Sequence, residues 1–413
     1  MKTPNLVHRF LGPALLIFLL ASCKGVGIFS TLAVTEKVVD GSIPDGISAD
    51  AGVLYASGIT PNWAFFSAGP SMWAKDLVTA DAAWKRIPLP SDYNEYAIQS
   101  IASTANYILL SAVGTSGGSR TTTLYYVASG DVGVDGTLTY NPIVTWTSTN
   151  TEYYNASVFS TGMGNTFYIN RLTSDDFDTD DADITASELY SWNGSLSGPD
   201  GNFDINLNTW PNFRYVTDVA DGGGGALFTV QDEDSEAGRL LDSTGGAVAV
   251  VEATTAIDYS TRPFSSIEWL GGTVSAYFMG IATISSPNNG ALLVSSDGIT
   301  WYTVDNVDND DTYVSFVDVS DVAGSNWILA GRDICGEDGG YEQIDVDTAA
   351  IGTDTWFVSN GDFADSTSYI STDMADVTIT DFTIIGTTLY ASTRYAGIYS
   401  LNIGGVGNEW VEE

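Results

Sequence analysis

Carboxylates are the reactive side chains that this sequence supplies in quantity. The chain has 52 acidic and 14 basic residues, and its formal net charge at pH 7 is −38. Two carboxyl groups about 5–9.5 Å apart, one with a raised pKa, suffice to hydrolyse a glycosidic bond. Glu188 and Glu268 stand in the apolar runs ASELYSW and SSIEWL, and we select them as the candidate catalytic acids. The alternative for both is a strand residue that faces solvent or a central channel.

Histidine and cysteine chemistry is scarce. The single histidine is His8, and the two cysteines are Cys23 and Cys335. We expect His8 to be removed with the N-terminal segment, which leaves no imidazole for a Ser–His–Asp or Cys–His centre, a metal site or a haem. The sequence therefore favours a protein that is not an enzyme and that requires no cofactor.

Calcium is the one metal that the acidic clusters suggest, because Ca²⁺ prefers oxygen ligands. The densest cluster contains Asp176, Asp178 and Asp180 with the alternating spacing of an EF-hand loop. Asp181 stands where that loop needs glycine, and Ser187 stands where it needs glutamate, so an EF-hand is excluded. We predict an irregular calcium site here, and the alternative is a solvated acidic loop. Two further acidic clusters lie at 232–236 and 305–311.

The charge balance also bears on partners. Binding to nucleic acid requires clustered lysine and arginine, which this chain lacks. Attraction to anionic headgroups is disfavoured for the same reason. The acids are scattered among Gly, Ser, Thr and aromatic residues, so the chain is not a disordered acidic tail. We expect a solvated, self-repelling surface and a monomer.

The elements that would position these residues are strands. From about residue 45 onward, short runs rich in Tyr, Phe, Val, Ile, Thr and Trp alternate with Gly, Asn, Asp, Ser and Pro, which is typical of an antiparallel all-β protein. One four-part unit recurs, most clearly in the final copy, where VTITDFTII, TTLYAST and AGIYSLN precede Trp410. The predicted second strands are centred near Tyr55, Leu109, Tyr168, Phe228, Phe278, Leu329 and Tyr390.

A late tryptophan marks the fourth strand in six of the seven copies. These residues are Trp84, Trp146, Trp210, Trp301, Trp356 and Trp410. In the remaining copy, Val250 or a neighbour takes that place. A four-stranded unit of roughly 40–60 residues that repeats is typical of a β-propeller. We predict an all-β β-propeller of seven four-stranded blades. The alternatives, a β-sandwich array and a β-solenoid, would show domain linkers or much shorter repeats.

One loop carries a family resemblance. Ser295-Ser296-Asp297-Gly298-Ile299-Thr300-Trp301 resembles the Asp box of the BNR-type propellers, which include sialidases and sortilin-like receptors. Unlike the family motif, this segment has no residue between Asp297 and Gly298. Of the seven predicted repeats, one contains the segment. The resemblance implies a turn between the third and fourth strands, in which Asp297 binds turn amides and Trp301 packs inside. Sialidase activity would need three arginines around a carboxylate and a Tyr/Glu pair, and we do not expect it.

The N-terminus resembles that of a bacterial lipoprotein. Lys2, His8 and Arg9 precede the apolar run 10–20, which is shorter than the roughly 20 residues that span a bilayer. Leu20-Ala21-Ser22-Cys23 then resembles a lipobox, which implies cleavage before Cys23 and its acylation with chains such as palmitate. We expect a signal peptide at 1–22, a lipidated tether with an extra strand at 23–44, and one propeller domain at 45–413.

Two functions remain open from the sequence. The favoured one is a lipid-anchored binding or scaffold protein of the cell envelope that uses its loop faces to contact a protein or a glycan. The alternative is a carbohydrate-active enzyme of the glycoside hydrolase type with a carboxylate pair. Lys24 follows Cys23 where an aspartate would resemble an inner-membrane retention signal, which favours the outer membrane.

Overall fold

The computed structural model divides into two units, Met1–Val39 and Asp40–Glu413. The described residues lie in the second unit and are 52–68, 71–89, 97–116, 119–149, 152–161, 164–174, 184–194, 213–232, 238–242, 247–248, 251–252, 264–272, 274–281, 291–304, 312–319, 327–332, 340–347, 357–362, 374, 377–394, 396–403 and 410–413. Within these ranges, no helix has the length and apolar character needed to span a membrane.

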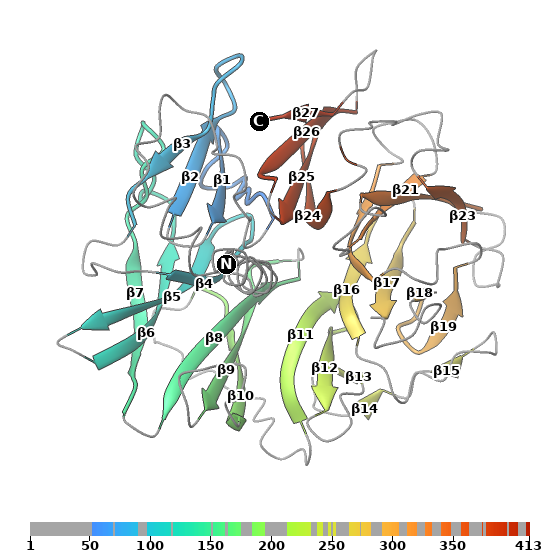
Figure 1. The fold of residues 1–413 in the computed structure, drawn as a ribbon, viewed down its shortest axis with the longest axis horizontal. Coiled ribbons are helices and arrows are strands. Elements are labelled where there is room, and N and C mark those ends of the chain that lie inside the picture. Colours follow the sequence, from blue (N-terminus) through green and yellow to red (C-terminus); the bar gives the residue numbers. More distant parts are fainter. Residues whose placement is uncertain are drawn as a thin grey trace, which may run out of the picture. The chain divides into compact units, whose positions relative to one another are not determined.

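The described strands form seven sheets that follow one another along the chain, coloured from blue to red in Figure 1. The first three sheets contain β1 (Trp63–Ala68), β2 (Ser71–Asp76) and β3 (Lys85–Ile87); β4 (Ala97–Ser103), β5 (Ile108–Ser116), β6 (Ser119–Val127) and β7 (Asn141–Thr147); and β8 (Tyr153–Ser160), β9 (Phe167–Ser174) and β10 (Ile184–Trp192). The fourth contains β11 (Phe213–Asp221), β12 (Ala226–Asp232), β13 (Gly238–Asp242) and β14 (Ala247–Val248).

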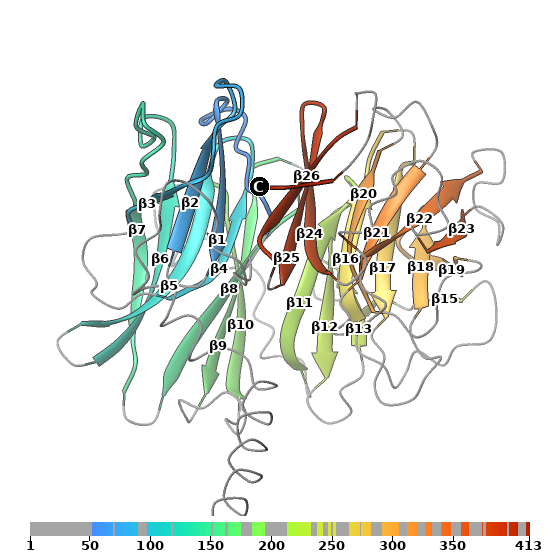
Figure 2. The same ribbon diagram turned by 45° about the horizontal axis from the view of Figure 1, so that its top comes forward.

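The last three sheets complete the series (Figure 2). The fifth contains β15 (Val251–Glu252), β16 (Phe264–Leu270), β17 (Ala276–Ile281), β18 (Ala291–Ser295) and β19 (Thr300–Thr303); the sixth β20 (Tyr313–Asp318), β21 (Trp327–Arg332), β22 (Tyr341–Val346) and β23 (Phe357–Asp362); the seventh β24 (Thr378–Ile385), β25 (Thr388–Arg394), β26 (Ile398–Asn402) and β27 (Val411–Glu412). Apart from β15, neighbours in every sheet are antiparallel.

One strand of each sheet contacts its counterpart in the next sheet. These strands, which we call the first strands, are β1, β4, β8, β11, β16, β20 and β24 in that order. In the first sheet an isolated bridge residue, and in the fifth sheet the short strand β15, precedes this strand in the chain. Both faces of a sheet carry buried side chains, because the alternating residues of each strand point to opposite faces and each face packs on a neighbouring sheet. The core is accordingly divided into apolar clusters, and each of six clusters lies between two consecutive sheets.

Side chains join the seventh sheet to the first. The rings of Trp84 and Tyr390 meet edge to face with centroids 6.3 Å apart. Lys75 on β2 forms an ion pair with Glu413, and the backbone amide of Gly52 donates to the carboxylate of Asp381 on β24. The described strands of the first sheet all come from the N-terminal part of the chain, and those of the seventh all come from the C-terminal part. No described strand is shared between the two sheets, so packing and polar contacts between side chains hold them together.

The predicted all-β β-propeller is confirmed, and its seven sheets follow the seven predicted repeats. The assignment of the first repeat was wrong by one strand. Leu54 makes a single bridge to Phe65, so β1 is the second element of its sheet and the centre near Tyr55 belongs to the first. The chain turns directly after this bridge, where the amides of Ile59 and Thr60 donate to the carbonyl of Ala56.

A second difference concerns the run AVAVVEA, which the sequence placed in the fourth repeat as one strand. Ala247–Val248 pairs with β13 of the fourth sheet. Val251–Glu252 instead pairs in parallel with β19 of the fifth sheet. One apolar run therefore contributes a short strand to each of two neighbouring sheets. Its hydrophobicity does not show where the first strand ends and the second begins.

Candidate functional site

An extra residue bulges from five of the seven first strands. The bulged residues are Gln99, Thr217, Ser265, Val314 and Thr380. A bulge bends a strand and redirects the next side chain. The residue after each bulge is small and polar, and these residues are Ser100, Asp218, Ser266, Ser315 and Asp381.

Side-chain oxygens near the bulges accept backbone amides from the first strand of the next sheet. Ser100 Oγ accepts Val158 N at 2.8 Å, and Asp218 Oδ2 accepts Ile267 N at 2.9 Å. A side-chain oxygen accepts a backbone amide of the next sheet at six junctions, and we name these groups the inter-sheet belt: Ser100, Asn170, Asp218, Glu268, Ser315 and Asp381. Two members differ in detail, because Asn170 lies on the second strand β9 and Asp381 accepts the amide of Gly52, which precedes β1. The belt replaces the water that first-strand amides would otherwise bind, and it fixes the spacing between sheets.

Two glycines show how closely the sheets approach beside the belt. Gly280 and Gly331 stand opposite Ser266 and Ser315 in their own sheets. A Cβ on Gly280 would lie 2.0 Å from the carbonyl oxygen of Tyr313 in the next sheet. A Cβ on Gly331 would lie 2.7 Å from the side chain of Ile379. Larger residues would therefore push neighbouring sheets apart.

Three belt members are carboxylates with raised pKa values. Burial raises the pKa of Asp218 to about 7, against the lowering effect of the Ile267 and Val219 amides. Burial also raises the pKa of Asp381 to about 6. The pKa of Glu268 is raised well above its ordinary value by burial and then by the charges of Asp381 and Asp218. Each residue retains partial access to water, although protein atoms surround its carboxyl group.

Ser315 links two of these acids. Its Oγ lies 2.8 Å from Asp381 Oδ1 and 3.3 Å from Glu268 Oε1. The two carboxyl groups therefore lie close together, because the same serine oxygen contacts both of them. The sequence reasoning selected Glu268 and missed Asp218, Ser315 and Asp381. Their signal was a small polar residue before an apolar one in successive first strands, as in QSI, TDV, VSF and TDF.

A depression of about 420 Å³ opens where the first and seventh sheets meet. Tyr55 and Tyr390 contribute aromatic surface, and Lys75, Asp76, Asp81 and Thr388 contribute polar groups. The Thr79 hydroxyl and the Val78 amide donate to Asp76, which holds its pKa below the ordinary value and keeps it ionised. The ammonium of Lys75 lies 5.8 Å from the centre of the Tyr390 ring.

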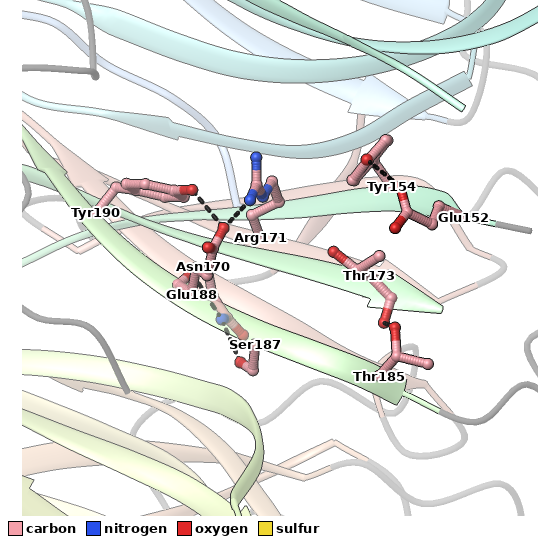
Figure 3. A network of polar contacts seen from close by, with 9 residues as sticks. All are labelled: Glu152, Tyr154, Asn170, Arg171, Thr173, Thr185, Ser187, Glu188 and Tyr190. Atoms are coloured by element: carbon pink, nitrogen blue, oxygen red, sulfur yellow. Dashed lines mark hydrogen bonds and ion pairs between the residues drawn. The ribbon is translucent and has the colours of Figure 1, made fainter. Parts of the chain in front are cut away.

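Glu188, the other candidate acid, lies on β10 in a separate network (Figure 3). Its carboxylate forms an ion pair with Arg171 and accepts the hydroxyl of Tyr190. The guanidinium of Arg171 also lies 5.5 Å from the ring centres of Trp146, Tyr154 and Tyr190. Glu188 therefore bonds within the third sheet, where its partners Arg171 and Tyr190 contact Trp146 of the second sheet. The structure does not bring Glu188 together with Glu268 on β16.

The loop that resembles an Asp box is a turn between β18 and β19. Asp297 Oδ1 accepts the amides of Ile299 at 2.8 Å and Thr300 at 2.7 Å. Although burial acts to raise the pKa of Asp297, these amides and the Ser295 hydroxyl lower it overall. Gly298 has a φ of +74°, which favours glycine, and its carbonyl accepts the indole N–H of Trp301 at 3.2 Å. Asp297 and Trp301 thus both form hydrogen bonds within this turn.

The described late tryptophans lie at junctions between sheets. Trp84 and Trp301 are about 1% exposed, and Trp410 is 4% exposed. Trp410 donates its indole N–H to the hydroxyl of Tyr341 in the sixth sheet at 3.1 Å. Trp146 is only half-buried, against Tyr190. In the third sheet the buried tryptophan is Trp192, at the end of β10, which the repeat analysis did not single out.

The other predicted site residues lie outside the described residues. These are Cys23, the calcium candidates Asp176, Asp178 and Asp180, and the tryptophans Trp210 and Trp356. Among the residues that the structure does describe, no group of three or more His, Cys, Asp or Glu side chains is placed to hold a metal ion.

Comparison with known proteins shows the fold. No protein-family model and no curated protein sequence matches the chain. A prolyl endopeptidase structure is 8% identical, with a TM-score of 0.51, over 89% of this chain and 50% of that one. The extracellular domain of the one-component system BT4673 from B. thetaiotaomicron is 12% identical, with a TM-score of 0.48, over 87% of this chain and 39% of that one. YCF48 bound to a D1 peptide is 8% identical, with a TM-score of 0.45, over 88% of this chain and 97% of that one.

Proposed function

We propose that this protein is a lipid-anchored binding module of the bacterial cell envelope, with its ligand site in the depression between the first and seventh sheets. The observation that carries the binding role is this depression. Its volume falls within the range of roughly 300–1,000 Å³ that is common for ligand sites. Its lining combines residues of connections, such as Tyr55 before β1, Asp81 between β2 and β3, and Gly386 between β24 and β25, with residues at the ends of β2, β24 and β25.

The lining favours a glycan over an apolar ligand. Carboxylates, hydroxyls and one ammonium can bind the hydroxyl groups of a sugar, while Tyr55, which is half-buried, offers apolar surface with a polar tip. Asp76 remains ionised, so it acts as a hydrogen-bond acceptor at neutral pH. A protein that inserts a polar side chain would use the same groups.

Ligand binding is tested by titrating cell-envelope glycans and peptides into the protein. We expect Tyr55→Ala and Asp81→Asn each to weaken binding about tenfold, or about 1.4 kcal/mol, because each removes a group that lines the depression. Asn tolerates the positive φ of 56° at position 81. Glu152→Gln, directly before β8, removes one charge away from the depression and should leave binding unchanged. Equal affinity in all four proteins would contradict the site.

The lipid anchor rests on the sequence Leu20-Ala21-Ser22-Cys23 and is tested separately. Cys23→Ala should abolish incorporation of radiolabelled palmitate and release the protein from the membrane fraction. Each buried methylene contributes about 0.8 kcal/mol, so the loss of two or more acyl chains removes stable attachment. A Cys23→Ala protein that is labelled as strongly as the wild type would rule out this anchor.

Two further parts of the proposal come from the sequence. The proposed location is the outer membrane, and a calcium site is proposed at Asp176, Asp178 and Asp180.

A glycoside hydrolase is the second candidate, and one observation favours it. Glu268 and Asp381 contact the same serine hydroxyl and have raised pKa values, as a catalytic acid requires. Their oxygens, however, also accept the backbone amides of Phe316 and Gly52 and so help to hold neighbouring sheets. We place this function second for that reason. Hydrolysis of glycosides by the wild type, lost in Glu268→Gln, would reverse the order.

A further inference from the structure

The hydrogen-bond contacts of Ser315 require one more proton than its hydroxyl can supply. Its hydroxyl has one proton to donate, yet its Oγ lies within hydrogen-bonding distance of two carboxylates, Asp381 and Glu268. The same Oγ also accepts the amide of Phe382 at 3.1 Å. If both acids were ionised, the Ser315 proton could serve one of them, and the other contact would join two lone pairs.

One added proton removes this conflict. We propose that Glu268 is protonated in the folded protein and donates a hydrogen bond to Ser315 Oγ, which makes the belt a proton-binding device that strengthens in acid. Ser315 then donates to Asp381, and its two lone pairs accept Glu268 and Phe382. Glu268 Oε2 continues to accept the amide of Phe316 at 3.2 Å. Glu268 of the fifth sheet, Ser315 of the sixth and Asp381 of the seventh then form a hydrogen-bonded series in which each contact joins a donor to an acceptor.

The charges around Glu268 support the same protonation state. The groups that act on it electrostatically are Asp381 on β24 and Asp218 on β11, and both are acidic. Burial and these two charges raise the pKa of Glu268 well above its ordinary value of 4.5. The other titratable groups with described side chains on the strands packed against β16 are Tyr215 and Asp221 on β11, Tyr277 on β17, and Tyr313 and Asp318 on β20.

The direction of the pH effect follows from linkage. Between its ordinary and its raised pKa, Glu268 binds a proton in the folded state and not in the unfolded state, so stability falls as pH rises through that window. Asp218, with a pKa of about 7, and Asp381, with a pKa of about 6, act in the same direction. When the pH rises by one unit between the ordinary and the raised pKa of such a group, the unfolding equilibrium constant increases about tenfold.

The test compares urea unfolding of the full-length wild type and Glu268→Gln at pH 5.5, 6.5 and 8.0, at constant ionic strength. The glutamine amide can donate to Ser315 and accept Phe316, as a protonated glutamate would. We expect Glu268→Gln to be at least as stable as the wild type at pH 8.0, with a shallower loss of stability between pH 5.5 and 8.0. Glu188→Gln, at an ion-paired acid outside the belt, should keep the wild-type slope.

An infrared measurement does not depend on the stability of the variant. The wild type at pH 7 should show the carbonyl band of a protonated carboxyl group, and Glu268→Gln should have lost that intensity. The proposal is overturned if the band is absent from the wild type, or if Glu268→Gln retains the wild-type pH slope. It is independent of the ligand site, because Tyr55→Ala should keep the wild-type pH slope whether or not it weakens binding.

Discussion

Trp301→Ala is expected to lower the free energy of unfolding by about 3–5 kcal/mol, the usual range for truncation of a large buried aromatic side chain. Trp301 is 1% exposed and packs among Leu227 and Leu240 of the fourth sheet and Phe264 and Leu293 of the fifth. Its indole N–H also donates to the carbonyl of Gly298 in the turn before β19. The substitution therefore opens a cavity at a junction between sheets and removes a contact within the turn. Urea unfolding measures the change directly.

Trp146→Ala is the matched control for this prediction. Trp146 is also a late tryptophan, but it is half-buried and stacks at 6.5 Å on Tyr190 near the protein surface. We expect its truncation to cost less than half as much, because water already reaches part of the ring and the neighbours can close over the gap. Equal losses for the two variants would mean that position in the repeat, not burial, determines the contribution.

Glu342→Gln is expected to destabilise the protein by a similar amount, about 3–5 kcal/mol. Glu342 on β22 and Arg332 on β21 form an ion pair at 2.8 Å, and both side chains are 1% exposed. The amide leaves the guanidinium charge buried without its carboxylate, and the cost of desolvating that charge is no longer offset. Replacing both residues together, as Arg332→Met with Glu342→Leu, should recover much of the loss, because both charges of this pair are removed.

Glu188→Gln provides the matched comparison. Glu188 pairs with Arg171, again across the second and third strands of one sheet, but the two side chains are 26% and 19% exposed. Water screens this pair, so we expect a cost of about 0–1 kcal/mol. Thermal or urea unfolding of the two glutamine variants side by side measures the difference. A loss at Glu188 as large as that at Glu342 would contradict burial as the deciding factor.

The sequence predicted the repeat architecture because that architecture depends on local patterns. Alternating apolar residues define each strand, and the spacing of similar runs defines the repeat, as in TTLYAST of the last copy, which forms β25. The turn at Asp297 was also predictable, because its hydrogen bonds join residues two and three positions apart. The first repeat failed where Leu54 makes a single bridge, since a strand of that length has no detectable period.

The belt could not be derived in the same way. Asp218 and Ile267 are 49 residues apart in the chain, and Ser315 and Asp381 are 66 apart, so their contacts depend on how successive sheets stack. The positions of Ser100, Asp218, Ser315 and Asp381 also depend on a bulge, which shifts the strand by one residue and reverses the face on which the next side chain lies. Neither the stacking nor the shift leaves a periodic signal in the sequence.

By itself, the sequence determined the fold class, the repeated sheets and the Asp297 turn, because strand alternation and turn hydrogen bonds act over a few residues. It also determined the shortage of histidine and the excess of acidic residues, which are matters of composition. The tertiary structure alone decided which acids act together. It separated Glu188 from Glu268, joined Glu268 to Asp381 through Ser315, and surrounded these carboxyl groups with protein atoms. A raised pKa requires burial and neighbouring charge in three dimensions, and a linear sequence specifies neither directly.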